Sequence, residues 1–198
     1  MQKTLLNVSE HVEVLAALDD DDPKLEEYTY APFTTACIGQ RVILTRRWNT
    51  LAKRTDADYL MLGNDDMRFA GPEWVDMIHT VDPRIPSVIG FPSGVHKDKH
   101  FPFPILTRKA YEVQGYFVPE IFAGLYADTW LYDIGRRSGS IHYFPDYHIE
   151  HLHWSSGERG RDGTDQDGST RKRSSDRGLF KETEQEREKI SERIRANI

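Results

Sequence analysis

Short apolar runs alternate with segments of helical periodicity along most of the chain. The runs are aliphatic or β-branched and stop at polar turns, which predicts buried strands at residues 12–18, 34–38, 58–62, 87–90, 141–143 and 147–152. Apolar positions at helical spacing predict helices at residues 42–53, 72–81, 107–113 and 128–137. This alternation favours an α/β fold with a mostly parallel sheet flanked by helices. Ligands of such sheets bind beyond the carboxyl ends of the strands.

The chain changes character after residue 154. Residues 155–178 are dominated by Gly, Ser, Asp and Arg, and they predict a flexible polar loop. Residues 179–198 predict a charged helix whose few apolar positions are Phe180, Ile190 and Ile194. We therefore expect a single minimal domain at 1–154, followed by this loop and a C-terminal helical tail. The tail is expected to lie on a surface or to dock on a partner, such as a second copy of the chain.

Composition narrows the classes of protein that fit this sequence. The 198 residues carry 26 basic and 32 acidic side chains, and the net charge of −6 weighs against a nucleic-acid partner. Cys37 is the one cysteine, which excludes an internal disulfide and a cysteine-based zinc site. The sequence predicts neither a signal peptide nor a membrane-spanning helix, so the expected location is the cytoplasm.

Acidic clusters follow two of the predicted strands. Four aspartates at 19–22 come directly after the first strand, and Asn64-Asp65-Asp66 follows the strand at 58–62. The first cluster either forms a solvated turn or accepts hydrogen bonds from a nucleobase and a ribose. The second either caps a helix or binds Mg²⁺ or Mn²⁺, which prefer carboxylate and phosphate oxygens.

Histidines and one further aspartate add candidate chemistry. Alternation along a strand places His151 and His153 on one face and His148 on the other. The zincin motif H-E-x-x-H is absent, which disfavours a hydrolytic zinc centre. We expect His151 or His153 to join the metal site and His148 to be structural. Asp128 lies at the start of a predicted helix, where it is either a cap or a general base held in a cleft.

Six short motifs occur in a fixed order along the chain. They are VEVLAALDDDDP at 12–23, LTRRWN at 44–49, LMLGNDD at 60–66, GYFVP at 115–119, ADTWL at 127–131 and EHLH at 150–153. In this order they resemble the nucleotide-sugar glycosyltransferases of GT-A fold, most closely small phage and bacterial members related to family two. The resemblance implies a Rossmann-like GT-A domain that transfers a sugar from a nucleotide sugar, with UDP-sugars favoured, to a sugar, glycan or other hydroxyl acceptor. It implies Mn²⁺ or Mg²⁺ as cofactor, and the host cytoplasm as location if the chain is phage-encoded.

The resemblance also implies a role for each matched position. Asp128 corresponds to the catalytic base of inverting members, Asp66 to the metal ligand of the D-x-D element, and His151 to the C-terminal histidine ligand. His153 stays open as the alternative ligand. The positions implied to bind the donor are Asp19, Asp20, Asp21, Arg46, Asn64, Asp65 and Gly115.

The chain also departs from the family pattern. Asn64 replaces the first aspartate of D-x-D, Ala127 replaces the residue that precedes the base, and no family-type first strand is predicted before Val12. These departures leave a second hypothesis, a module that binds a nucleotide sugar with little or no transfer. A third, a DNA-modifying glycosyltransferase, rests on Arg171-Lys172-Arg173 and is opposed by the acidic net charge.

Overall fold

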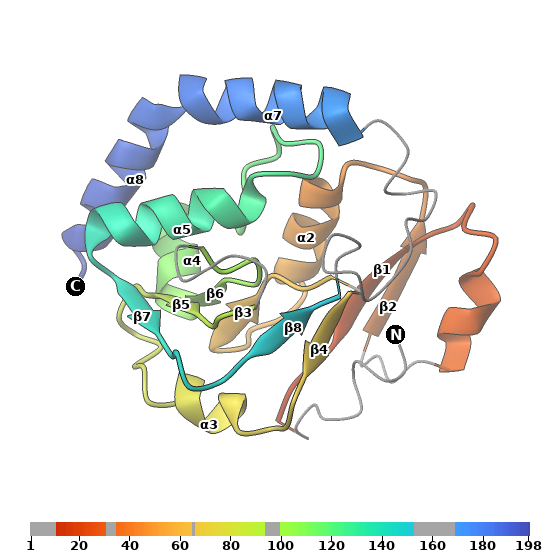
Figure 1. Cartoon of the computed structure of the whole chain (residues 1–198), viewed down its shortest axis with the longest axis horizontal. Helices are drawn as coiled ribbons and strands as arrows, with labels where there is room; N and C mark the ends of the chain where they lie inside the picture. The colour runs from red at the N-terminus through yellow and green to blue at the C-terminus, as the bar shows by residue number, and fades with distance from the viewer. Residues whose placement is uncertain (1–10, 31–34, 65, 94–99, 153–168) are drawn as a thin grey trace.

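The computed structural model describes residues 11–30, 35–64, 66–93, 100–152 and 169–198, of which 29, 30 and 169–174 are described by their backbone alone (Figure 1). The strands are β1 (Leu15–Asp19), β2 (Thr35–Gly39), β3 (Tyr59–Met61), β4 (Met67–Phe69), β5 (Val88–Gly90), β6 (Ile105–Thr107), β7 (Ile141–Tyr143) and β8 (Ile149–His151). The helices are η1 (Leu25–Tyr30), α2 (Leu44–Ala52), α3 (Trp74–Ile78), α4 (Arg108–Gln114), α5 (Ala127–Ser138), α7 (Ser169–Glu182) and α8 (Glu184–Arg195).

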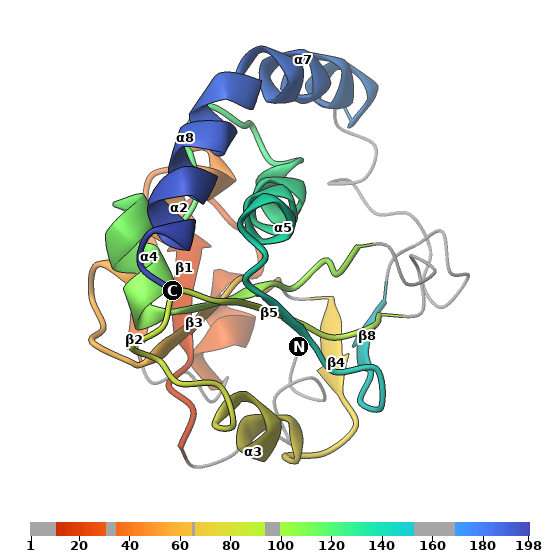
Figure 2. The ribbon, with the colours of Figure 1, turned by 90° about the vertical axis from the view of Figure 1, so that its left-hand side faces the viewer.

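A four-stranded sheet of order β3-β6-β5-β7 forms the centre of the molecule. Side chains alternate across a strand, so neighbouring residues enter different cores. Val88 and Leu106 pack with α4, α5 and α8, whereas Ile89 and Ile105 pack with α3, β4 and β8. Figure 2 shows this layering, with α5 and α8 on one side of the sheet and α3 on the other. Both faces of the central strands are therefore buried, which is typical of strands that read as continuous apolar runs.

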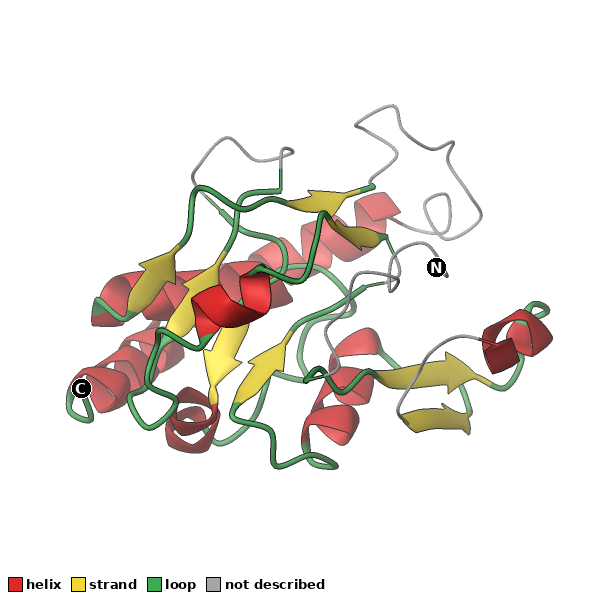
Figure 3. Cartoon of the chain, turned by 90° about the horizontal axis from the view of Figure 1, so that it is seen from below, coloured by secondary structure: helices red, strands yellow, loops and turns green. Residues whose placement is uncertain are grey.

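Two further strand pairs flank the central sheet. β1 pairs with β2 in parallel, with Asp19 opposite Gly39, and Figure 3 shows this pair to one side of the central strands. β4 pairs with β8 in antiparallel fashion, although 79 residues lie between Phe69, the last residue of β4, and Ile149, the first residue of β8. The first pair carries the acidic run beyond its carboxyl end, and the second brings together residues from distant motifs.

The α/β class is confirmed, but the mostly parallel sheet is found only in part. Among the described strands, the pairs β1–β2 and β5–β7 are parallel, whereas β3–β6, β5–β6 and β4–β8 are antiparallel. The difference arises mainly from β6, which lies between β3 and β5 and runs opposite to both. The sequence pattern predicted an irregular segment at 91–104 and a helix from 107, and so missed this strand.

The C-terminal segment differs from the flexible loop and tail expected from composition. Residues 169–178, predicted to be irregular, lie in α7, and the rest of the predicted loop lies outside the described residues. Helix α8 packs along α5 and α4 of the same chain (Figure 1). Ile190 and Ile194 are 2% and 1% exposed. The apolar positions expected to dock on a partner are thus buried within the chain itself.

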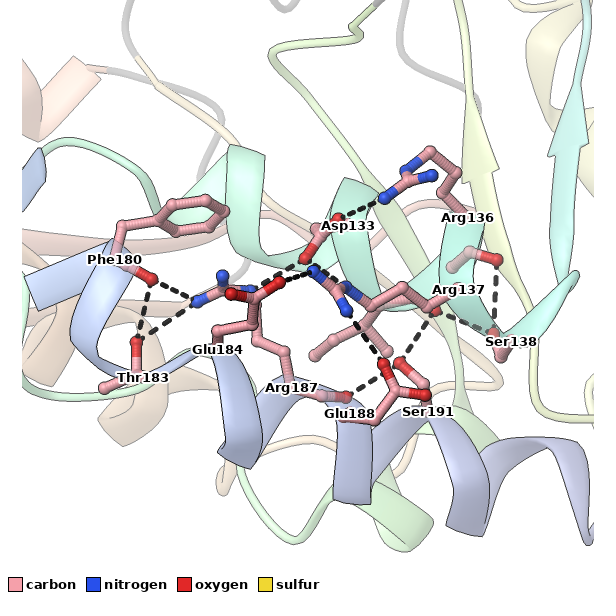
Figure 4. Close-up of polar contacts among 12 residues, drawn as sticks. Asp133, Arg136, Arg137, Ser138, Phe180, Thr183, Glu184, Arg187, Glu188 and Ser191 are labelled. Atoms are coloured by element: carbon pink, nitrogen blue, oxygen red, sulfur yellow. Dashed lines mark hydrogen bonds and ion pairs between the residues drawn. The ribbon is translucent and has the colours of Figure 1, made fainter.

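A buried ionic cluster joins α8 to α5 (Figure 4). Asp133 Oδ2 lies 2.8 Å from Arg187 Nε and 2.7 Å from Arg137 Nε, and its Oδ1 lies 3.1 Å from Arg136. The Arg187 guanidinium also lies over the Phe180 ring, 3.7 Å from its centroid. Burial alone would raise the pKa of Asp133, but hydrogen bonds from the three arginines outweigh it, so the pKa lies below its ordinary value.

Among the described residues, no helix combines the length and the apolar character that crossing a bilayer requires.

Candidate functional site

Asp66 and His151, both predicted to bind metal, face each other at one end of the β4–β8 pair. Met67 stands opposite His151, and the backbone N–H of Leu152 donates to the Asp66 carbonyl at 2.7 Å. This pairing brings His151 Nε2 to 3.0 Å from Asp66 Oδ2. The side chain of His151 is 14% exposed and that of Asp66 is 18% exposed, so both are largely shielded from solvent but still partly accessible. Residues from the third and the sixth sequence motifs therefore meet in one place.

The surroundings of His151 orient its ring. The Phe103 ring packs against it in an edge-to-face arrangement with the centroids 5.1 Å apart. One position earlier in β8, Glu150 forms an ion pair with Arg68, and both side chains are 45% exposed. Glu150 therefore points to solvent, as the predicted alternation requires. Asp65 and His153, the other expected members of this site, lie outside the described residues.

The Asp66–His151 pair supplies two of the ligand types that a divalent cation uses. A carboxylate oxygen suits Mg²⁺ and Mn²⁺, and an imidazole nitrogen favours transition metals. Within the described part of the chain, no group of three or more His, Cys, Asp or Glu side chains could hold a metal ion. The residues therefore fit an ion that takes its remaining ligands from substrate phosphates and water, which is the usual arrangement for Mg²⁺.

Asp128 lies in the first turn of α5, where a carboxylate is favoured by the positive end of the helix. The backbone N–H of Thr129 donates to Asp128 Oδ1 at 2.7 Å. On the other side, Asp128 Oδ2 lies 3.6 Å from Nε2 of His100. The Asp128 side chain is 29% exposed and that of His100 is 18% exposed. The structure thus places a partly accessible carboxylate beside an imidazole that the sequence motifs did not indicate.

The acidic run beyond β1 is compensated by arginines. Asp19 forms ion pairs with Arg47 at 3.1 Å and with Arg41 at 3.3 Å, and Arg41 also pairs with Asp21 at 3.2 Å. The hydrogen bond that Arg41 donates to the Asp21 carboxylate raises the pKa of Arg41. The Asp20 backbone N–H donates to the Gly39 carbonyl. These contacts reduce the repulsion among the carboxylates, and they also occupy oxygens that the resemblance assigns to a nucleoside.

The remaining predicted donor residues have local roles in the structure. Arg46 forms an exposed ion pair with Glu120 at 3.2 Å. Gly115 ends α4 with a φ of 90°, a conformation that favours glycine, and its N–H donates to the Tyr111 carbonyl. Asn64 is exposed, two residues before Asp66. These contacts of Arg46 and Gly115 do not join them to Asp66, so their part in a donor site stays a prediction.

The loop that leads into α5 is held by side chains from two helices. Asn49 of α2 donates to the Val118 carbonyl at 2.6 Å and accepts from the Phe117 N–H at 2.8 Å. Asp176 of α7 is 1% exposed and accepts from three successive backbone N–H groups, those of residues 123, 124 and 125. Tyr126 then takes a φ of 67° immediately before the helix. The start of α5, and with it Asp128, is therefore firmly positioned.

Sequence reasoning missed three of these residues, for different reasons. His100 lies in the segment at 91–104, which was interpreted only through its prolines and glycine. Asp176 lies in the stretch whose composition predicted a flexible loop. Asn49 belongs to the motif LTRRWN at 44–49. Its position, as a polar residue on the apolar side of a predicted helix, was the available sign of a buried hydrogen-bonding role.

Compared with protein-family models, with curated proteins and with solved structures, the chain shows no significant match.

Proposed function

We propose that this protein is a metal-dependent glycosyltransferase that uses a nucleotide sugar, with a UDP-sugar as the favoured donor. The observation that carries the proposal is the approach of Asp66 to His151, 3.0 Å apart although 85 residues separate them in sequence. The motif resemblance assigned both residues to one metal site, and the contact supports that assignment. The proposal includes a GT-A-type domain. Its support is that β1 ends at Asp19, where the acidic run begins, and that Asp66 lies in the connection between β3 and β4.

Each residue of the proposed site has a stated task. Asp66 and His151 would hold Mn²⁺ or Mg²⁺, with His153 as the alternative histidine ligand. A bound divalent cation supplies Lewis-acid stabilisation of the charge that develops on a departing diphosphate. Asp128 accepts the proton of the acceptor hydroxyl, a role that typically contributes about 10²- to 10⁴-fold in rate. The groups proposed to bind the donor are Asp19, Asp20, Asp21, Arg46, Asn64, Asp65 and Gly115.

Thermal unfolding with nucleotides and metal tests the proposal. We expect UDP with Mn²⁺ to raise the unfolding temperature by about 5–10 °C when UDP is near 100 times its dissociation constant. GDP, CMP and dTDP, each tested with Mn²⁺ in place of UDP, show whether the site prefers uracil. Mn²⁺ alone and UDP alone serve as controls. Asp66→Ala and His151→Ala should abolish the shift that requires both UDP and Mn²⁺. His148→Ala, which changes an exposed histidine three residues before His151, should keep it. No shift with any nucleotide and metal contradicts the proposal.

Transfer itself requires a second measurement. UDP release from UDP-hexoses and UDP-N-acetylhexosamines, with water or added sugars as acceptor, reports turnover directly. We expect Asp128→Asn to bind UDP with Mn²⁺ as the wild type does and to release UDP at least about 100-fold more slowly. Joint binding without release in the wild type would establish the second hypothesis, a binding module without useful transfer.

A further inference from the structure

His100 and Asp128 form a pair that the motif pattern does not contain. His100 Nε2 lies 3.6 Å from Asp128 Oδ2 and 3.2 Å from the hydroxyl oxygen of Thr129. The ring also packs against Tyr132, one turn further along α5, with the centroids 5.6 Å apart. An imidazole is thus held against the carboxylate proposed to act as base, with both groups partly exposed.

The Thr129 hydroxyl can serve either member of the pair. Its oxygen is 3.2 Å from His100 Nε2 and 3.2 Å from Asp128 Oδ1. A hydroxyl has one proton to donate, so it can bond to one of these groups at a time. If Nε2 lacks a proton, the hydroxyl donates to Nε2. If Nε2 carries a proton, Nε2–H donates toward Thr129 or Asp128, and the hydroxyl turns to Asp128 Oδ1. The arrangement therefore accommodates both protonation states of the ring without movement of heavy atoms.

The ordinary proton affinities of the two groups set the direction of transfer. An unperturbed imidazole has a pKa near 6.5 and an unperturbed aspartic acid has a pKa near 3.9. A proton newly placed on a carboxyl group beside a neutral imidazole therefore moves to the imidazole. Without such a neighbour, a protonated base must lose its proton to water before it can act again.

We propose that His100 receives the proton that Asp128 removes from the acceptor hydroxyl, so that Asp128 and His100 act as a relay. In the step, the acceptor oxygen bonds to the anomeric carbon as the bond from that carbon to the diphosphate oxygen breaks, with its electron pair leaving on the diphosphate. The hydroxyl proton goes to Asp128 Oδ2 and then to His100 Nε2. His100 acts through Asp128 and is a positioning residue rather than a catalytic one. This inference rests on the proposed function and extends it.

Kinetics of a histidine variant test the relay. We expect His100→Ala to lower kcat for UDP release to an acceptor by about 10- to 100-fold, less than the full contribution of a base, with KM for the donor unchanged. Added imidazole should restore part of the lost rate, because it can enter the space left by the ring and accept the same proton. His142→Ala, on an exposed histidine of β7, is the matched control and should show neither loss nor rescue.

Three kinetic outcomes separate the two proposals. A wild-type protein that releases no UDP from any donor would contradict the proposed function. An active wild type with an unaffected His100→Ala variant would overturn the relay alone. A slow variant that imidazole does not rescue would also overturn it, because a purely structural loss is not repaired by a free base.

The pairing can also be measured without activity. The titratable groups that α5 presents to the His100 ring are Asp128 and Tyr132. NMR of labelled histidine follows protonation of the ring in the wild type and in Asp128→Asn. Removal of the carboxylate charge should lower the midpoint for His100 by about one pH unit, because a nearby anion favours the imidazolium. Equal midpoints in the two proteins would overturn the proposal whether or not the wild type is active.

Discussion

One cluster of aspartates and arginines lies between α5 and α8 and another lies beyond β1, and the two clusters differ in burial. Between α5 and α8, the side chains of Asp133 and Arg187 are 12% and 3% exposed. Beyond β1, the side chains of Asp19 and Arg41 are 30% and 63% exposed. Water screens the second cluster and leaves its side chains free to exchange partners, whereas Asp133 and Arg187 of the first are largely shielded from solvent.

The difference separates a structural role from a binding role for the same pair of residue types. A buried charge that loses its partner stays buried, so the first cluster fixes the relative positions of two helices. An exposed pair contributes little to stability, and a ligand can replace one of its members at small cost. The β1 cluster is therefore the better candidate for recognition, and the α5–α8 cluster is the better candidate for positioning Asp128.

The largest effect is expected from breaking the buried cluster. Asp133→Ala leaves Arg187 buried without its carboxylate, so we expect the free energy of unfolding to fall by about 3–5 kcal/mol. Urea unfolding followed by circular dichroism measures this. Asp76→Ala, at an exposed position on α3, is the control and should change little. A loss as small as that of the control would mean that α8 does not depend on this cluster.

A smaller loss is expected at Asp176. Asp176→Ala leaves three backbone N–H groups of the loop before α5 without their acceptor, which should cost about 2 kcal/mol. The same urea experiment applies. Asp22→Ala removes a carboxylate that accepts one backbone N–H in an exposed turn and is the matched control. Equal losses in the two variants would show that the buried loop contacts do not contribute more than an exposed turn.

The pH dependence of stability sharpens the comparison further. The pKa of Asp133 is depressed in the folded protein. Its ionised form therefore contributes fully to the free energy of unfolding above the ordinary carboxyl pKa, near pH 4, and this contribution is lost as the pH falls through the lower pKa of the folded state. The stability difference between wild type and Asp133→Asn should therefore be constant from pH 5 to 7 and shrink below about pH 4. Unfolding curves at each pH measure it, and a difference that grows on acidification would contradict the assigned direction.

The smallest effect is expected from the exposed cluster. Arg41→Ala removes ion pairs to Asp19 and Asp21, but Asp19 keeps Arg47, so we expect no measurable change in the urea midpoint. The same variant should change the affinity for UDP if the cluster belongs to the donor site. A large loss of stability would erase the proposed distinction between the two regions.

Local periodicity predicted most elements but not how they pair. The strand at 141–143 was predicted with its observed bounds, and helix α5 was predicted to within one residue at each end. The three-residue strands β4 and β6 were missed because each is too short for a period and β6 follows a proline-rich stretch. The part of α7 at residues 169–178 was missed because its composition predicts a loop, whereas contacts with the rest of the chain hold it in place, as the bonds of buried Asp176 to the loop before α5 illustrate.

The candidate site shows the same limit. Asp66, His151 and Asp128 were predicted by residue type and motif, because their chemistry is visible in a single residue. His100 could not be predicted, because its relevance comes only from a neighbour 28 residues away in sequence, Asp128. Which side chains contact each other depends on the fold of the chain, and residue type alone does not specify the fold.

The position of α8 in the chain has a consequence for biosynthesis. It is the last described element to leave the ribosome, yet it covers the apolar side of α5, an element made about 50 residues earlier. Until α8 emerges, Ile134 and its apolar neighbours on α5 lack the contacts that α8 makes with them, and the nascent chain exposes a hydrophobic surface. Translation that stops short of α8 would therefore leave a chain prone to aggregation, with the start of α5 not yet in place for chemistry.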